Sequence, residues 1–284
     1  MSANLSSPPV GATVGLLHPG QMGASVGAAL VGSGARVLWA SRGRSAESRG
    51  RAGAAGLVDA GDLGTLVRDC SVLLVICPPS AALATARAVA GAGFRGIYAD
   101  LNATAPATAS AIGATVADAG ARFVDGDLIG GPAGAGHGPR LFLSGGDAGT
   151  VGELFAGTAL AVEVIGDGVE ASALKMCYAA WTKGTAALLL DIRALARATG
   201  VEAALLAEWS RSQPDLARRC DAAVAVAGRG WRYAGEMEEI AATFAAAGLP
   251  EGHARAAAEV YQRLAAFKGA TPPLDSVLAA LPAG

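Results

Sequence analysis

The feature that most constrains the fold is an alternation of short apolar runs with longer Ala-rich segments in the first half of the chain. Gaps of helix length between strand-like runs are typical of βαβ units, in which helices join parallel strands. Runs such as VLLVI (72–76) are apolar throughout, as expected for a strand that is covered on both faces. The pattern predicts a doubly wound, mostly parallel sheet of the α/β class. Its strands are expected at 13–17, 36–40, 56–60, 71–77, 96–101, 121–126, 140–145 and 161–166.

The second half has a different pattern, because no strand-like run follows Gly166. Segment 170–200 spaces its larger residues alternately by four and three, which marks one face of a helix. Apolar residues also flank that face, so we expect a helix buried nearly all round, with a second subunit as one source of neighbours. Further helices are expected near 202–226, 233–247 and 251–267. We therefore expect a Rossmann domain at 1–166 and an all-helical domain at 167–284.

Composition excludes several classes of protein. The 284 residues are 52% hydrophobic and 16% charged with a net charge of -2, so a sizeable core is expected and nucleic-acid binding is not. The N-terminus lacks the features of a signal peptide, and Pro78 and Pro79 interrupt the apolar run at 71–86. We expect no membrane partner and a cytoplasmic location. The histidines do not cluster and no C-x-x-C occurs, so we expect no metal site and reduced thiols at Cys70, Cys77, Cys177 and Cys220.

A Gly-rich turn, LLHPGQMG, follows the first predicted strand at 16–23. Gly20 and Gly23 occupy the second and third glycine positions of the dinucleotide fingerprint G-x-G-x-x-G, and His18 replaces the first. Pro19 fixes its own φ near -65° and could hold the turn in place of that glycine. By itself the turn fits a phosphate site and an ordinary strand-to-helix turn equally well. The predicted cofactor-binding residues here are His18, Pro19, Gly20, Gln21, Met22 and Gly23.

The loop after the second strand bears on the choice of cofactor. NAD-binding proteins usually place an acidic residue there for the ribose 2′-hydroxyl. This loop instead carries guanidinium and hydroxyl groups, which suit a 2′-phosphate, and NADP(H) is predicted. A solvated basic loop is the alternative, because Arg49 and Arg51 follow. The residues predicted to bind the 2′-phosphate are Ser41, Arg42, Arg44 and Ser45.

Several stretches together resemble the β-hydroxyacid dehydrogenase family, which includes 3-hydroxyisobutyrate dehydrogenase and the 6-phosphogluconate dehydrogenase-like enzymes. In the second half, 173–190 and 231–250 resemble uncharacterised dehydrogenase-like proteins and imine reductases. The resemblance covers nearly the whole chain. It implies a Rossmann domain, a helical C-terminal domain and a homodimer whose long helices interlock over the active site. The stretches that carry it are VGLLHPGQMG, VICPPS, DLNATAP, VDGDLIGGPAGAGHG and GDGVEASALKMC.

The resemblance also implies roles for individual residues. Lys175 falls on the catalytic lysine of the family. Helical spacing places Tyr178, three residues further on, on the same side, as a secondary proton-donor candidate, and a core tyrosine is the alternative. The segment 125–135 resembles the substrate loop, in which Gly130, Gly131, Gly134 and Ala135 match. Beside the cofactor we expect Cys77, Pro78, Asn102 and Thr104, and around the substrate Asp127, Ile129, Gly130, Gly131, Trp181 and Glu238.

Three departures from the family pattern affect the substrate pocket. Ile129 replaces the serine of the substrate loop, and Ala179 replaces an asparagine four residues after the lysine. Residues 238–240 read Glu-Glu-Ile, where the family often has Lys-Asp-Leu. These losses weaken the case for a small β-hydroxyacid as the substrate.

The sequence thus predicts an NADPH-dependent oxidoreductase that transfers hydride between nicotinamide and a small carbonyl or alcohol, with Lys175 as general acid or base. A lysine that only covers apolar surface with its stem is the alternative for Lys175. Imine reduction is a second hypothesis, favoured by acidic Glu238 and Glu239 but opposed by Lys175, where imine reductases often have Asp or Tyr. A third is a non-catalytic NADP(H)-binding sensor, suggested by His18 and Ala179.

Overall fold

A computed structural model of the chain describes residues 13–132 and 138–282. The chain divides into two compact units, Met1–Lys175 and Met176–Gly284, and the division lies within helix α7 (Glu170–Ala198). The domain boundary predicted at 166 stays a prediction. Each unit is described by itself below.

The first unit is built on an eight-stranded sheet of order β3-β2-β1-β4-β5-β6-β7-β8, and this confirms the predicted α/β fold class. Neighbouring strands are parallel except for β6 and β7. Across the sheet the strand numbers fall from β3 to β1 and then rise from β4, so the topological switch point lies between β1 and β4. Doubly wound sheets bind ligands at this point, beyond the carboxyl ends of the strands. The strands are β1 (Thr13–Leu17), β2 (Arg36–Trp39), β3 (Val58–Asp59), β4 (Val72–Val75), β5 (Ile97–Asp100), β6 (Arg122–Ile129), β7 (Arg140–Ser144) and β8 (Ala161–Gly166).

Every predicted strand is present, and β6 is longer than expected. It continues past 126 to Ile129, because its last residues pair with antiparallel β7 and Ile129 lies opposite Arg140. Sequence patterns at one strand do not reveal this pairing, since it depends on the partner. Because of this extension, Asp127 and Leu128 belong to β6 and lie near its carboxyl end.

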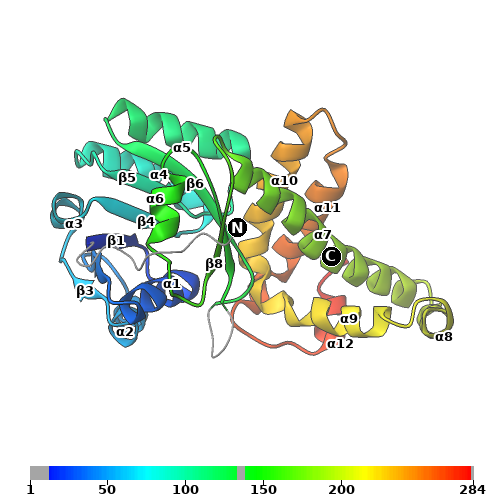
Figure 1. Cartoon of the computed structure of the whole chain (residues 1–284). Coiled ribbons are helices and arrows are strands. Elements are labelled where there is room, and N and C mark those ends of the chain that lie inside the picture. The colour runs from blue at the N-terminus through cyan, green and yellow to red at the C-terminus, as the bar shows by residue number, and fades with distance from the viewer. Residues whose placement is uncertain (1–12, 133–137, 283–284) are drawn as a thin grey trace. The chain divides into compact units, whose positions relative to one another are not determined.

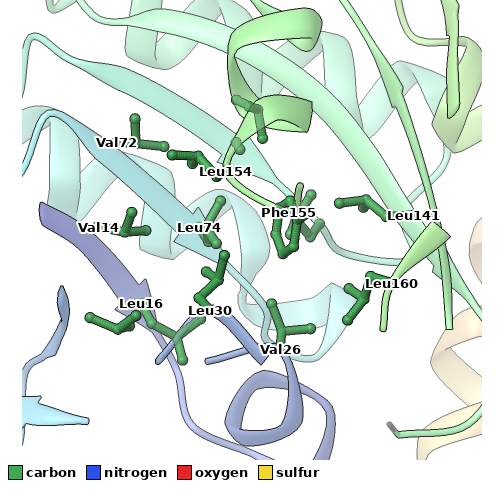
Figure 2. Close-up of a cluster of buried hydrophobic side chains, with 14 of the residues drawn as sticks. Val14, Leu16, Val26, Leu30, Val72, Leu74, Leu141, Leu154, Phe155 and Leu160 are labelled. Atoms are coloured by element: carbon green, nitrogen blue, oxygen red, sulfur yellow. The ribbon is translucent and has the colours of Figure 1, made fainter. Parts of the chain in front are cut away.

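Helices cover both faces of the sheet (Figure 1). On one face, side chains of α1, α2 and α6 pack on the strands, and Figure 2 shows Val26, Leu30 and Phe155 in this core. On the other face, α3, α4 and α5 pack on alternate residues of the same strands. Proline at the first position of α4 and of α5 favours helix initiation, because its missing N–H would have no intrahelical acceptor. The helices are α1 (Gln21–Gly32), α2 (Ala46–Ala54), α3 (Leu63–Asp69), α4 (Pro79–Gly91), α5 (Pro106–Asp118) and α6 (Ala148–Glu153).

In the described residues of the second unit, helices are the only regular secondary structure, and short loops connect them. The stretch predicted as helical at 202–226 is two helices, because Pro214 lacks an amide hydrogen and separates them. In the described part of the chain, no helix combines the length and apolar character needed to cross a membrane. After α7 come α8 (Glu202–Ser212), α9 (Leu216–Ala225), the 3-10 helix η1 (Ala227–Arg229), α10 (Gly230–Ala246), α11 (Gly252–Arg263), the 3-10 helix η2 (Leu264–Phe267) and α12 (Leu274–Ala279).

Helix α7 corrects one expectation. It was expected to be buried nearly all round, yet Trp181 is 61% exposed and Leu195 is 64% exposed. Tyr178 and Leu188 are exposed as well, and all four belong to the face that the four-and-three spacing marks. The prediction is wrong for a single chain, because the described residues leave this face largely exposed. We call these four residues the α7 stripe.

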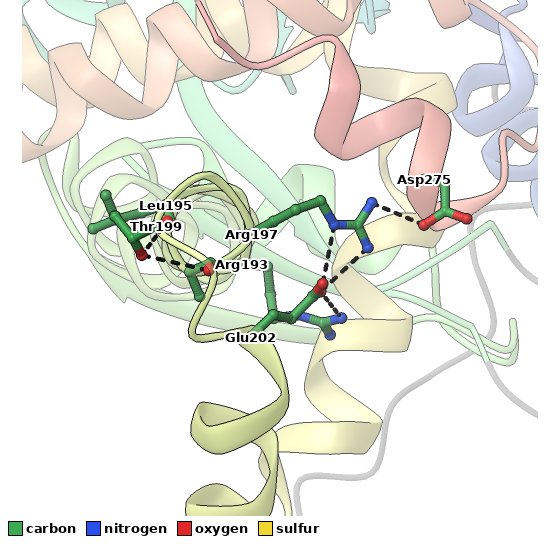
Figure 3. A network of polar contacts seen from close by, with 7 residues as sticks. Arg193, Leu195, Arg197, Thr199, Glu202 and Asp275 are labelled. Carbon is green, nitrogen blue, oxygen red and sulfur yellow. Dashed lines mark hydrogen bonds and ion pairs between the residues drawn. The ribbon is translucent and has the colours of Figure 1, made fainter.

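A polar network joins three helices of the second unit (Figure 3). The Glu202 carboxylate accepts hydrogen bonds from Arg193 Nη2 at 2.6 Å and from Arg197 Nε at 3.0 Å. Arg197 also donates to Asp275 at 2.8 Å. Arg193 is buried, so Glu202 offsets the charge that it brings into the interior.

We expect Glu202→Ala to lower the free energy of unfolding by about 2–3 kcal/mol, because it leaves the buried Arg193 guanidinium without its acceptor. Asp275→Ala is the matched control, since Asp275 is 84% exposed and such a pair contributes at most ~1 kcal/mol. Urea denaturation of both variants measures the difference. Equal effects would show that burial of Arg193 does not set the strength of the network.

Candidate dinucleotide-binding and catalytic site

The Gly-rich turn lies at the switch point of the sheet. His18 follows β1, and its amide donates to the Ile76 carbonyl at 3.4 Å, which ties the turn to the segment after β4. Gly20 is the N-cap of α1 and provides no side-chain cap. The first-turn amides of a helix have no intrahelical acceptors and carry the positive end of its dipole. This geometry fits an anion such as a diphosphate.

Gly23 and Gly20 differ in what an added side chain would meet. A Cβ at Gly23 would lie 2.3 Å from the His18 carbonyl oxygen, so only glycine allows the helix to start this close to the strand. A Cβ at Gly20 would meet no protein atom within 4 Å, and its backbone is extended with φ -70°. The protein itself therefore does not require glycine at 20, whereas a ligand lying on the turn would.

His18 and Arg44 meet at the wall of a cavity of about 770 Å³. Arg44 Nη2 lies 3.4 Å from His18 Nε2. Burial, and secondly the Arg44 charge, lower the pKa of His18 from 6.5 to about 4, so the imidazole is neutral near pH 7. Much of the wall consists of small residues that no motif in the sequence marks: Ala40, Gly64, Ala81, Ala84 and Ala88.

The other residues predicted for the 2′-phosphate have partners within the protein. Arg42 also lines the cavity but pairs with Asp62 at 3.0 Å. The Ser45 hydroxyl caps α2 by accepting from the Ser48 amide at 3.2 Å. Ser41 is buried. Arg44 therefore differs from the other three predicted residues, whose side chains already have partners within the protein.

A second group of predicted residues lies at the carboxyl ends of β4 and β5. The Cys77 amide donates to Asn102 Oδ1 at 2.5 Å, and Asn102 Nδ2 donates to Asp100 Oδ1. Burial raises the pKa of the Cys77 thiol to about 12, so it stays neutral. Pro78 is the N-cap residue of α4, and Thr104 is fully buried. The structure therefore brings Cys77 and Asn102 into contact at the carboxyl ends of these strands.

Asp100 is a polar residue of this group that the sequence analysis does not single out. Its side chain is fully buried, and burial, together with the nearby Asp125 and Asp127 carboxylates, raises its pKa well above the usual range. The Asn102 hydrogen bond opposes that shift without cancelling it. In the sequence, Asp100 could be identified only as an acidic residue at the end of an apolar strand.

Lys175 is held at the end of β6. Its Nζ donates to Asp127 Oδ1 at 2.6 Å and to the Leu128 carbonyl at 2.7 Å. The side chains are 12% and 3% exposed, respectively, for Lys175 and Asp127. These two acceptors fix the position of the ammonium group at the carboxyl edge of the sheet.

Asp125 fixes the start of α7 next to Lys175. Its carboxylate accepts from the Ser172 amide at 2.9 Å, the Ser172 hydroxyl at 2.6 Å and the Ser144 hydroxyl at 3.0 Å. Burial raises the pKa of Asp125 despite these donors. Asp125 thus connects β6, β7 and the helix that carries the lysine.

The remaining predicted residues are placed as follows. Ile129 is buried against Phe142 and Ala171, and Gly130 turns the chain with φ +124° after it. Gly131 is exposed, and Gly134 and Ala135 lie outside the described residues. In the second unit, the Arg219 guanidinium lies 5.8 Å from the centre of the Trp181 ring, and Glu238 lies 3.5 Å from Arg255. Tyr178 is exposed in the α7 stripe.

Within the described residues, no group of three or more His, Cys, Asp or Glu side chains could hold a metal ion. The cysteines Cys70, Cys77, Cys177 and Cys220 are free thiols.

Comparison with solved structures gives the same fold. MTH1747, a conserved protein of unknown function with structural similarity to 3-hydroxyacid dehydrogenases, is 26% identical over 90% of this chain and 97% of its own, with a TM-score of 0.66. 3-Hydroxyisobutyrate dehydrogenase from Mycobacterium tuberculosis, solved with L-serine, is 18% identical over 96% and 99%, with a TM-score of 0.68. An imine reductase from Streptomyces aurantiacus is 19% identical over 95% and 100%, with a TM-score of 0.54.

Family comparison identifies both parts of the chain. Residues 196–264 match a domain of unknown function, DUF1932, and no curated protein matches the sequence. Residues 12–166, more than half of the chain, match the NAD binding domain of 6-phosphogluconate dehydrogenase. The chain therefore belongs to the family of the 6-phosphogluconate dehydrogenase NAD-binding domain and is, as predicted, an NAD(P)-dependent oxidoreductase.

Proposed function

We propose that the protein uses NADP(H) to reduce a small carbonyl compound, with Lys175 as the proton donor. The observation that carries this proposal is the Lys175 ammonium held by Asp127 and the Leu128 carbonyl at the edge of the sheet. The first-turn amides of α1 would hold the diphosphate, and Arg44 the 2′-phosphate. When bound, the nicotinamide supplies the hydride.

The contacts of Lys175 favour the reductive direction. An ammonium has three protons to donate and no acceptor, which suits two oxygen atoms within 2.7 Å. In reduction, the protonated lysine gives a proton to the developing alkoxide. Oxidation would require a neutral amine, which the Asp127 carboxylate disfavours. Asp127, expected to bind substrate, acts in this proposal as a positioning residue for Lys175.

Imine reduction is the second candidate. It is supported by the resemblance of 173–190 and 231–250 to imine reductases and by the fold shared with the imine reductase from Streptomyces aurantiacus. Oxidation of NADPH with a panel of β-ketoacids and cyclic imines, together with reduction of NADP+ by β-hydroxyacids, separates the two candidates. Tight NADPH binding without turnover on any of them would contradict both candidates.

The cofactor assignment predicts that NADPH binds at least about tenfold more tightly than NADH, because a charged hydrogen bond contributes ~1.5–3 kcal/mol. Arg44→Gln should remove most of that preference. Arg42→Gln is the matched control and should change it less, since Arg42 is already paired with Asp62. Quenching of tryptophan fluorescence measures both affinities. Equal or tighter binding of NADH by the wild-type protein would contradict the assignment.

We also propose a homodimer through α7. The α7 stripe is apolar and exposed, and a groove of about 470 Å³ lies beside it between Leu188, Ile192, Leu195 and Leu281. Apolar patches of this kind mark interaction surfaces. Sedimentation equilibrium should give twice the chain mass of 27.9 kDa, and Leu195→Glu should shift the mass toward one chain. A wild-type mass of one chain would contradict the dimer.

A further inference from the structure

His18 stands where the dinucleotide fingerprint has its first glycine, and its imidazole is turned to the loop after β2. Its Nε2 lies 3.4 Å from Arg44 Nη2, although the two residues are 26 apart in sequence. Both side chains line the same cavity. A glycine at 18 would offer no side-chain acceptor, so this contact exists only because of the departure from the fingerprint.

The arginines of this loop differ in what holds them. Arg42 pairs with Asp62, and Arg51 pairs with Glu47 and donates to the Pro19 carbonyl. Arg49 donates to the backbone carbonyls of Ser41 and Arg44. Among the ion pairs found in the described residues, none involves Arg44, whose side chain meets the imidazole instead.

The nature of the acceptor decides what Arg44 can still bind. A carboxylate would offset the guanidinium charge, whereas a neutral imidazole orients the group and leaves its charge available to an anion. Neutral histidine carries one N–H, so an accepting Nε2 places the proton on Nδ1. Burial keeps the imidazole in this neutral form near pH 7.

We propose that His18 is a positioning residue that holds Arg44 for the 2′-phosphate of an adenosine ligand. The inference rests on the proposed NADP(H) function and adds a residue that sets specificity for it. In this chain the contact between His18 and Arg44 joins the diphosphate turn to the 2′-phosphate loop. The histidine at the first glycine position therefore contributes to the preference for NADP(H) over NAD(H).

Calorimetric titration with 2′,5′-ADP and 5′-AMP tests the inference without any turnover. His18→Phe keeps a ring of similar size but removes the acceptor, and should weaken 2′,5′-ADP about tenfold while leaving 5′-AMP unchanged. His18→Gln offers an amide oxygen and should recover part of the loss. Binding of 5′-AMP shows in each case that the variant is folded.

Four results would overturn the inference, and they are distinguishable. If His18→Phe leaves both affinities at their wild-type values, His18 has no part in 2′-phosphate binding. If both ligands weaken equally, or if His18→Gln recovers nothing, His18 only shapes the cavity. A wild-type protein that does not prefer 2′,5′-ADP would overturn the NADP(H) assignment itself, and the inference with it.

Discussion

Lys175→Met is expected to lower kcat by about 10²- to 10⁴-fold, the usual contribution of a positioned proton donor. NADPH binding should be retained, because the diphosphate turn and Arg44 are formed by other elements. The measurement is steady-state kinetics with the best substrate from the carbonyl and imine panel. Lys268→Met is the matched control, since Lys268 is an exposed lysine whose Nζ lies 4.3 Å from the centre of the Trp231 ring. Full activity of Lys175→Met would remove Lys175 from the mechanism.

Asp127→Asn refines this experiment. The amide keeps an oxygen acceptor for Lys175 but removes the negative charge that favours the ammonium. We expect the basic limb of the kcat profile to move to lower pH, because the lysine then loses its proton more easily. A residue with only a structural role would change stability without moving that limb.

The second large effect is expected for Gly23→Ala. The added Cβ would lie 2.3 Å from the His18 carbonyl oxygen, so the start of α1 must move away from β1. Because amide hydrogen bonds to a charged group contribute ~1.5–3 kcal/mol each, NADPH binding should weaken by at least about 100-fold. Fluorescence titration measures the affinity, and urea denaturation the accompanying loss of stability.

Two glycines provide matched controls for Gly23. Gly32→Ala changes the last residue of the same helix, where a Cβ meets no atom within 4 Å, and should keep NADPH binding. Gly20→Ala should keep the folded stability within ~1 kcal/mol, yet lose binding, because its Cβ would occupy the space of the diphosphate. Unchanged NADPH affinity in both Gly20→Ala and Gly23→Ala would argue against a cofactor on this turn.

Most of the fold was predictable because its signals are local. Continuous apolar runs mark the strands that helices cover on both faces, and the positions of β1, β4 and β8 agree closely with the expected ranges. The break at Pro214 was missed although proline carries the signal, since the flanking helical pattern continues on both sides. Exposure of the α7 stripe could not be read from periodicity, which gives a helix face but not what covers it.

The site was predictable residue by residue but not in its contacts. Lys175 and Asp127 are 48 residues apart, and their pairing depends on β6 continuing beside antiparallel β7. The buried Asp100 follows from the position of β5 inside the sheet, which a single strand pattern does not give. The sequence shows His18 only as a departure from the fingerprint. Its contact with Arg44 could not be predicted, because it depends on the pairing of β1 with β2 in the folded sheet.

The central claim is that the turn from His18 to Gly23 holds the diphosphate of NADP(H). A crystal structure of the protein grown with NADPH tests it most directly. The account predicts diphosphate oxygens within hydrogen-bonding distance of the first amides of α1, and the 2′-phosphate at Arg44. A dinucleotide bound elsewhere, or a turn closed by the His18 imidazole against phosphate, would contradict it.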